Sequence, residues 1–292
     1  MTEGWSRWPA PAKLNLFLHI VGRRADGYHL LQTVFQLLDW GDSVRLRPRQ
    51  DGVVARLEGL PDVAPEQDLA VRAALALRQR AGGELGADIA VEKRVPVGGG
   101  LGGGSSDAAS VLLALNEVWQ LHLSVDELAE IALSLGADVP MFVRGKSAWA
   151  EGVGEQLTPI DLPSRSYVIV DPGVHVPTTQ LFQAAELTRN TPRLTISGFL
   201  GGVETANAFA PVVRARFPQV ATALEWLSKF GDARLSGSGG CVFVAAESAS
   251  QADMIVSDCR PEFKAYRADG VASSPMFDAL REYRAGQSIS SA

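Results

Sequence analysis

The chain has 292 residues, of which 46% are hydrophobic and 21% charged, so it is long enough for two globular domains and shows no bias toward disorder. Its formal net charge of −6 excludes broad electrostatic binding of nucleic acid, so an anionic ligand needs a local site. We find neither a signal-peptide pattern nor an apolar run of the roughly 20 residues that span a bilayer, and we therefore expect a cytoplasmic protein without membrane contact.

Cysteines and histidines give no sign of a disulfide or a metal site. The two cysteines, Cys241 and Cys259, are far apart and lack the spacing of a metal-binding pair. The four histidines, at positions 19, 29, 122 and 175, show no zinc-ligand spacing. The ligands of any metal therefore stay unknown from the sequence.

The first patterned segment, residues 12–21, alternates leucine and isoleucine with other residues in the period of a β-strand. This alternation puts Lys13 and Asn15 together on the face opposite the leucines. A single lysine in such a strand is commonly a solvated charge, and the pattern alone leaves that interpretation open. A turn follows that carries Tyr28 and His29.

The next segments predict strands and helices in alternation. Residues 30–48 predict one or two strands, and residues 66–81 predict a helix with one apolar face. Residues 88–97 predict a strand that leads into a glycine-rich loop. The helix after that loop has apolar residues spaced three and four apart over residues 108–119.

A capping box marks the start of a further helix. Ser124 and Glu127 have the spacing of that motif, and the helix is expected to end near Gly136. Asp138 then lies just beyond the helix end. Residues 146–155 predict a hairpin.

A domain boundary is predicted at residues 159–164, which gives an N-terminal domain of residues 1–162 and a C-terminal domain of residues 163–292. The second domain is expected to contain a strand at 167–170, helices near 178–187 and 205–229, and a second glycine loop within 234–246. The final 15 residues are expected to be loose.

Six of the seven residues from Gly98 to Gly104 are glycine, and Ser105, Ser106 and Asp107 follow. Ordering so many glycines costs backbone entropy, which calls for a functional reason. A strand leads into the loop and a periodic helix leaves it, and in that context backbone N–H groups and a helix N-terminus bind anions. The pattern favours a phosphate-binding loop over a flexible linker, with serine hydroxyls available to phosphate oxygens or Mg²⁺.

Two common phosphate motifs do not fit this loop. A P-loop ends in Gly-Lys followed by Ser or Thr, whereas this loop ends in Gly-Ser-Ser. Gly98, Gly100 and Gly103 satisfy the GxGxxG spacing, but the acidic residue that ends a second strand about 20 positions later in dinucleotide-binding folds is missing. A nicotinamide-dependent oxidoreductase is therefore disfavoured.

Three motifs resemble those of the galactokinase, homoserine kinase, mevalonate kinase and phosphomevalonate kinase (GHMP) superfamily: PAKLNL in the first strand, PVGGGLGGGSSDAA in the glycine loop and RLSGSGGCVF in the late loop. Two longer blocks, PAKLNLFLHIVGRRADGYHLLQTVFQLLD and LGADVPMFVRGKSAWAEGVGE, narrow the resemblance to the branch that acts on 4-diphosphocytidyl-2-C-methyl-D-erythritol. The resemblance covers residues 1–245 in recognisable blocks and the remainder loosely.

The resemblance implies an α+β fold of two domains, the N-terminal one like the second domain of ribosomal protein S5 and the C-terminal one ferredoxin-like, with the active site in the cleft between them. It implies a small-molecule kinase that transfers phosphate from ATP to the 2-hydroxyl of the methylerythritol, giving ADP and the 2-phosphate, in the non-mevalonate route to isoprenoid precursors. ATP is then a co-substrate, and Mg²⁺ is its expected metal. The expected partner is a small-molecule substrate, and no pattern indicates an oligomeric state.

By the same resemblance, Asp138 is the expected catalytic base and Lys13 its cationic partner, although the pattern alone also allows Asp138 to be a turn residue. Leu69 and Lys93 match positions near the adenine and ribose of ATP. Asp68 stands where the family has asparagine. The resemblance therefore does not determine whether the side chain at position 68 contacts adenine. The expected phosphate cradle comprises Pro96, Val97, Gly98, Gly99, Gly100, Leu101, Gly102, Gly103, Gly104, Ser105 and Ser106.

The expected acceptor site contains Asn15 near the substrate and Thr178 as a hydrogen-bonding group. Tyr28 and His29 match a pair that recognises cytosine, and Phe182 matches the aromatic residue on the other side of that ring. Without the resemblance, Phe182 is a typical core residue. The glycines of the late loop are expected to let it pack beside the phosphate loop.

Two other functions stay open. The first is a kinase for another small alcohol, such as homoserine or mevalonate, but these acceptors carry no base to stack on Tyr28 and Phe182. The second is a non-catalytic ligand sensor on the same fold, which has no need of Lys13 and Asp138.

Overall fold

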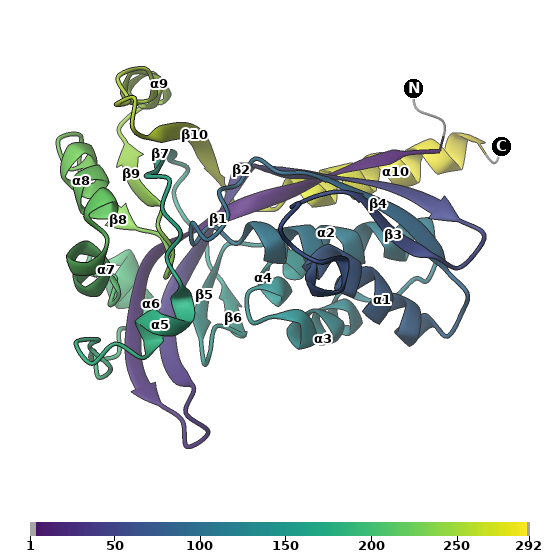
Figure 1. The fold of residues 1–292 in the computed structure, drawn as a ribbon, viewed down its shortest axis with the longest axis horizontal. Coiled ribbons are helices and arrows are strands. Elements are labelled where there is room, and N and C mark those ends of the chain that lie inside the picture. The colour runs from purple at the N-terminus through teal and green to yellow at the C-terminus, as the bar shows by residue number, and fades with distance from the viewer. Residues whose placement is uncertain (1–3, 291–292) are drawn as a thin grey trace.

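The computed structural model describes residues 4–290, which form one long sheet with helices at both ends (Figure 1). The first half of the chain contains β1 (Ser6–Arg23), β2 (His29–Arg49), β3 (Val54–Glu58), a 3₁₀ turn (Pro65–Gln67), α1 (Leu69–Ala81), β4 (Gly86–Glu92), α2 (Gly103–Val118), α3 (Val125–Leu135), α4 (Val139–Arg144), β5 (Ala148–Glu151) and β6 (Gln156–Pro159). The second half contains β7 (Ser166–Asp171), α5 (Thr178–Phe182), α6 (Ile196–Leu200), α7 (Ala210–Arg216), α8 (Pro218–Leu227), β8 (Arg234–Leu235), β9 (Val242–Ala246), α9 (Ala249–Ser257), β10 (Lys264–Val271) and α10 (Pro275–Ser290).

The sheet is organised around two long antiparallel strands, β1 with 18 residues and β2 with 21. The order along the main path is β3-β4-β2-β10-β7-β9-β8, while β1 and β5 also pair with β2, and β6 pairs with β5. In Figure 1, helices α1 to α4 and α10 lie toward one end of the long strands, and α5 to α9 lie toward the other. The two long strands therefore connect two helical regions.

Each helical region has its own apolar core. In the first, α1, α2 and α3 pack with β2 and β4, and the buried residues include Leu77, Ile89 and Leu112. In the second, α7, α8 and α9 pack with β7 and β9, and the buried residues include Val168 and Leu224. Burial of apolar surface thus stabilises each region separately.

A third, smaller cluster joins the two regions. It contains Leu14 from β1, Leu101 from the glycine loop and Cys241 from the segment before β9. The glycine loop is therefore held where the two regions meet.

The strand predicted at residues 12–21 is confirmed within β1, but both of its faces are buried. Lys13 and Asn15 are each 3% exposed, so the interpretation of Lys13 as a solvated charge is wrong. The late loop covers this face, and the hydroxyl of Ser236 accepts a hydrogen bond from the backbone N–H of Asn15 at 3.3 Å. The pairing of β1 with β2 also shifts between Asn15 and Leu18, an irregularity that interrupts simple alternation.

Three helices differ from their predicted bounds. The helix expected near residues 178–187 ends already at Phe182, as α5. α2 begins at Gly103, so the last glycines and both serines of the predicted loop form its first turn. The single helix expected over residues 205–229 is split into α7 and α8, because Pro218 has no N–H with which to continue α7. By contrast, the capping box at the start of α3 and the β5–β6 hairpin are confirmed.

The C-terminal segment is helical, which corrects the expectation that the last 15 residues are loose. α10 runs to Ser290, and its residues Met276 and Leu280 are buried in the core of the first helical region. The ring of Tyr283 lies 5.0 Å from the ring of Trp8. The prediction failed because the apolar partners of α10 come from β1 and α2, which are distant in the sequence.

None of the helices within residues 4–290 combines the length and apolarity needed to cross a membrane.

Candidate active site

The glycine-rich loop takes backbone conformations that favour glycine. Gly98, Gly100 and Gly102 have φ angles of +73°, +78° and +74°, in the left-handed region. A Cβ on Gly100 would lie 2.0 Å from the carbonyl oxygen of Ser236. The N-terminus of α2, a helix of 16 residues, follows at Gly103. Free backbone N–H groups and the helix dipole make this segment suited to an anion.

The late glycine loop, residues 236–241, packs backbone to backbone on the first loop. The N–H of Gly240 donates to the carbonyl oxygen of Gly98 at 3.1 Å. A Cβ on Gly239 would lie 2.0 Å from the nitrogen of Gly100, so a larger residue does not fit there. The prediction that the late loop packs beside the phosphate loop is confirmed.

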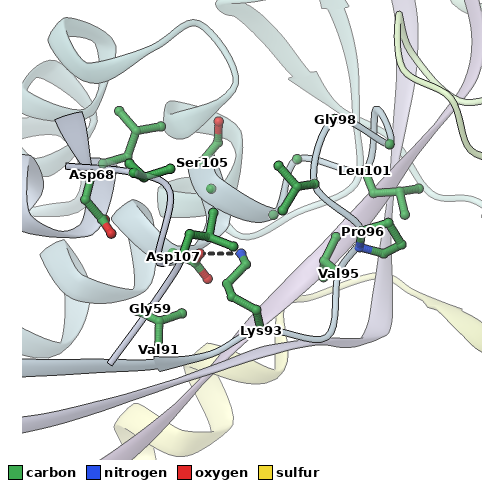
Figure 2. A pocket seen from close by; sticks show the side chains of 18 of the residues that line it. Gly59, Asp68, Val91, Lys93, Val95, Pro96, Gly98, Leu101, Ser105 and Asp107 are labelled. Carbon is green, nitrogen blue, oxygen red and sulfur yellow. Dashed lines mark hydrogen bonds and ion pairs between the residues drawn. The ribbon is translucent and has the colours of Figure 1, made fainter. Parts of the chain in front are cut away.

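A first cavity, of about 340 Å³, opens beside the glycine loop (Figure 2). Leu69 and Lys93, the two residues predicted near an adenine and ribose, both line it. The predicted phosphate cradle lines it as well, from Pro96 through Ser105. Ser106 does not: its hydroxyl is buried and has no hydrogen-bond partner among the described residues.

Two carboxylates hold Lys93, the one basic side chain among the described residues that line the first cavity. Its Nζ lies 2.6 Å from Oδ2 of Asp107, and it also bonds Asp42. Figure 2 marks the contact between Lys93 and Asp107 with a dashed line. Asp42 accepts a further hydrogen bond from the N–H of Val95 at 2.8 Å, which attaches the start of the loop to this cluster. Burial lowers the pKa of Lys93, but the two carboxylates outweigh burial and raise it.

Asp107 has a strongly shifted acidity. Burial disfavours its charged form, and repulsion from Asp42 acts in the same direction, so the pKa of Asp107 rises to about 7 against the opposing attraction of Lys93. Two carboxylates and one ammonium in a buried cluster leave one negative charge in excess. Uptake of a proton by Asp107 removes that excess.

Lys13 and Asp138 meet in a second cavity, of about 390 Å³, which shares Gly100 and Gly102 with the first. Nζ of Lys13 lies 3.6 Å from Oδ2 of Asp138 and donates to the carbonyl oxygen of Gly100 at 2.9 Å. Burial lowers the pKa of Lys13, while the charge of Asp138 opposes this shift. Asp138 precedes α4, and its side chain is 36% exposed, so its carboxylate is accessible to a ligand.

Asn15 orients Lys13 from the same strand. Its side-chain oxygen accepts a hydrogen bond from Nζ of Lys13, and its side-chain nitrogen donates to Oγ1 of Thr33 at 2.9 Å. Asn15 also lines the second cavity. It therefore supports the ammonium group and borders the space available to an acceptor.

Aromatic residues lie at another part of the second cavity. Phe182 and Thr178 line it together with Phe209. The rings of His29 and Phe182 are stacked, with centroids 5.1 Å apart and planes at 27°. Tyr28 is 65% exposed and is absent from the residues that line the cavity. The structure thus brings His29 and Phe182 together, but neither His29 nor Tyr28 is among the residues that line the second cavity.

Asp68 is already engaged by structural partners. One carboxylate oxygen accepts a hydrogen bond from the N–H of Ala70 at 2.8 Å, which caps α1. The other oxygen accepts from Nη1 of Arg56 at 2.8 Å. Asp68 therefore stabilises the start of α1 next to Leu69.

Sequence reasoning missed three residues of the site. Asp42 and Asp107 hold Lys93, and Nε of Arg189 donates to Nε2 of His29 at 3.1 Å. Asp107 has a local signal, because it directly follows the loop serines. Asp42 and Arg189 contact residues that are 51 and 160 positions away, and such contacts leave no local pattern.

The described residues contain no group of three or more His, Cys, Asp or Glu side chains arranged to hold a metal ion. The Ser105 residue lines the first cavity at the start of α2. This donor set fits Mg²⁺, which keeps several waters and is bound largely through phosphate oxygens with few protein ligands.

Two family models match the chain, "GHMP kinases N terminal domain" over residues 68–146 and "GHMP kinases C terminal" over residues 194–264. A 4-diphosphocytidyl-2-C-methyl-D-erythritol kinase of Xanthomonas euvesicatoria pv. vesicatoria is 57% identical over 277 residues, 94% of each chain. A kinase of the same name from Halorhodospira halophila is 54% identical over 285 residues, 97% of this chain and 98% of the relative.

Solved structures show the same similarity. The crystal structure of a 4-(cytidine 5'-diphospho)-2C-methyl-D-erythritol kinase has a TM-score of 0.80 and 34% identity, and the match covers 91% of this chain and 100% of the other. A homoserine kinase from Cytophaga hutchinsonii shares the fold, with a TM-score of 0.67 at 17% identity over 94% of this chain and 96% of the other.

Proposed function

The chain belongs to the 4-diphosphocytidyl-2-C-methyl-D-erythritol kinases, a family of the GHMP kinases, and on that premise we propose that it phosphorylates the 2-hydroxyl of this substrate with ATP. The products are ADP and the 2-phosphate, in the non-mevalonate route to isoprenoid precursors. One observation carries the proposal: the Lys13–Asp138 pair lies in a cavity that shares Gly100 and Gly102 with the cavity of the phosphate loop.

In the proposed reaction, the phosphoryl group passes between the two cavities along the loop at Gly100 to Gly102. The bond from the γ-phosphorus to the β–γ bridging oxygen breaks, and a bond from the same phosphorus to the 2-oxygen forms. Asp138 accepts the proton of the attacking hydroxyl, while the ammonium of Lys13 stabilises negative charge on that oxygen. Asn15 and the Gly100 carbonyl keep Lys13 in position.

ATP is placed in the first cavity. The apolar wall near Leu69 suits the adenine, with Lys93 close to the ribose, and backbone N–H groups within residues 97–105 suit the phosphates. Mg²⁺, when bound, neutralises phosphate charge. Ser105 offers a hydroxyl oxygen, and oxygen is the type of ligand that Mg²⁺ prefers.

Within the two-domain fold, we assign residues 1–162 to an S5-like domain and residues 163–292 to a ferredoxin-like domain, with the active site in the cleft between them. Two separate apolar cores support this division. The second cavity also supports it, because Asp138 comes from the first region and Phe182 from the second. The helix α10 departs from the division, since it packs on the first core.

The base of the substrate is placed at Phe182 and His29, with Thr178 as a further hydrogen-bonding group. The stacked aromatic pair supports this placement. Homoserine and mevalonate carry no base that could pack against these rings. Tyr28 is exposed and adjacent to His29, which suits a ring that covers a bound base. Asn15 is placed near the sugar alcohol.

The test is ADP release from Mg-ATP with 4-diphosphocytidyl-2-C-methyl-D-erythritol, for the wild type and for Asp138→Asn. We expect the wild type to turn over and the variant to be slower by on the order of a hundredfold or more, because it lacks the general base. Asp138 makes no capping hydrogen bond, so the variant should keep its fold. A wild type that binds ATP but is inactive with this acceptor supports a ligand sensor or a kinase for another alcohol.

A further inference from the structure

Arg189 reaches the proposed base site from the loop that follows α5. Its Nε donates to Nε2 of His29 at 3.1 Å. Its terminal nitrogens donate to three backbone carbonyls, those of Leu187 at 3.0 Å, Phe182 at 3.1 Å and Ala184 at 2.7 Å. The guanidinium therefore attaches the His29 ring to the backbone segment that carries the Phe182 ring.

The contacts of Arg189 are unusual for a half-buried cation. Glu186 lies three residues earlier in the sequence, but its carboxylate pairs with Arg216. Within residues 4–290, the acceptors of Arg189 are one imidazole and three carbonyl oxygens, and no carboxylate pairs with it. A planar guanidinium held by several directed hydrogen bonds has a fixed orientation, so its bond to His29 has a fixed direction too.

This bond determines which nitrogen of His29 carries the proton. A guanidinium N–H always donates, and arginine stays protonated in proteins. Nε2 of His29 must therefore offer its lone pair to Arg189, and a neutral ring then has its proton on Nδ1. Burial, together with the positive charges of Arg189 and Arg23, lowers the pKa of His29, which keeps the ring neutral near pH 7.

We propose that Arg189 is a specificity-determining positioning residue that holds His29 in the tautomer with an Nδ1–H donor for the base of the substrate. The inference rests on the proposed function, because it concerns the same base site. No described residue accepts a hydrogen bond from Nδ1, so this proton is available to a ligand. Cytosine presents a lone pair at N3, whereas uracil presents N3–H, so the donor matches cytosine and opposes uracil.

The first experiment needs no substrate. Long-range ¹H–¹⁵N NMR distinguishes protonated from unprotonated imidazole nitrogens, and the His29 signals are assigned by their loss in His29→Gln. In the wild type we expect Nδ1 protonated and Nε2 unprotonated. In Arg189→Met we expect a mixture of tautomers. A wild-type ring that carries its proton on Nε2 overturns the proposal.

A matched control comes from the same segment. Arg193 is an exposed arginine that pairs with Glu151 and does not contact His29. Arg193→Met removes an arginine of equal charge and size, and exposed ion pairs contribute little to stability. The His29 signals in this variant should equal those of the wild type. An equal change in both variants would indicate a general loss of charge rather than a contact with His29, and would overturn the proposal.

The second experiment compares the cytidine substrate with its uridine counterpart. We expect the wild type to prefer cytidine in kcat/KM by on the order of a hundredfold, because a site built to bond one base rejects a mispaired one. Arg189→Met should reduce the preference to about tenfold or less, mainly through a higher KM for the cytidine substrate. Arg189→Lys, which keeps a cationic donor, should retain more of the preference than Arg189→Met. Unchanged preference in Arg189→Met overturns the proposal.

The two experiments separate this inference from the proposed function. If the wild type releases no ADP with the cytidine substrate, the proposed function fails, and the NMR measurement still decides the tautomer. If the wild type is active and the His29 proton lies on Nε2, the function stands and the role of Arg189 does not.

Discussion

The backbones of Gly239 and Gly100 are in direct contact: a Cβ on Gly239 would lie 2.0 Å from the nitrogen of Gly100. The same contact region positions Lys13, the cation of the proposed reaction. The carbonyl oxygen of Gly100 accepts hydrogen bonds from Nζ of Lys13 at 2.9 Å and from Oγ of Ser236 at 3.0 Å. The late loop therefore supports both the phosphate loop and the residue that the proposed reaction uses.

This contact predicts a large effect from one methyl group. Gly239→Ala must push the two loops apart, which displaces Gly100 and with it Lys13. We expect kcat for ADP release to fall by on the order of a hundredfold, because displacements of about 1 Å near reacting groups have effects of that size. Gly83→Ala is the control, since its Cβ would meet only the Leu85 side chain at an ordinary 3.6 Å. Equal kcat values for the two variants would contradict the argument.

The raised pKa of Asp107 predicts a pH-dependent stability. Its pKa of about 7 in the folded protein is above the value of about 3.9 in an unfolded chain, so the folded state binds the proton more tightly. The contribution of Asp107 to stability therefore falls as pH rises from about 4 to about 7, by up to about 1.4 kcal/mol per pH unit. Asp107→Asn cannot ionise. Its Tm relative to the wild type should rise from pH 5 to pH 7 and level off at higher pH.

Asp88 provides the control for this titration. It is a buried carboxylate that pairs with Arg47 and Arg49. Burial acts to raise its pKa, but hydrogen bonds from the two arginines outweigh burial and lower it. Its stabilising effect is therefore fully present above about pH 4 and is lost only at lower pH. Asp88→Asn should lower Tm by a constant amount from pH 5 to pH 8. A constant difference for Asp107→Asn as well would refute the shifted pKa.

The packing of α10 predicts that the C-terminal helix stabilises the first core. Leu280 is 3% exposed and lies in that core. Leu280→Ala should lower the free energy of unfolding in urea by about 2–5 kcal/mol, because it leaves a cavity. The neighbouring Arg281 has an exposed side chain, so Arg281→Ala should change the same quantity by no more than about 0.5 kcal/mol. Similar values for the two variants would show that α10 does not contribute to the core.

Features with a local signal could be predicted from the sequence. The phosphate loop is a run of glycines between a strand and a helix, and the capping box of α3 is a spacing of three residues. Lys13 and Asn15 share a strand face through simple alternation, and the structure places them in contact. The site beyond these features came from the resemblance of whole motifs. The role of Asp138 as the base stays a prediction until the variant is measured.

Features that depend on distant segments could not be predicted in this way. Local pattern left the burial of Lys13 undecided, because the loop that covers it follows more than 200 residues later. Tyr28 and His29 are neighbours in the sequence, yet only His29 packs against Phe182. The end of the chain has the composition of a loose tail and becomes helical against Trp8 and the first core.

The sequence by itself indicated which groups are available: a glycine-rich backbone suited to phosphate and, through the resemblance, Lys13 and Asp138 as the expected pair for proton transfer and aromatic rings expected at a base. Its information is local because glycine content, strand alternation and helix caps act over a few residues. Only the tertiary structure decided which of these groups are charged and in which direction their hydrogen bonds point. The pKa of Asp107 depends on burial beside Asp42, and the donor nitrogen of His29 depends on Arg189, because desolvation and hydrogen-bond direction arise only when distant segments pack together.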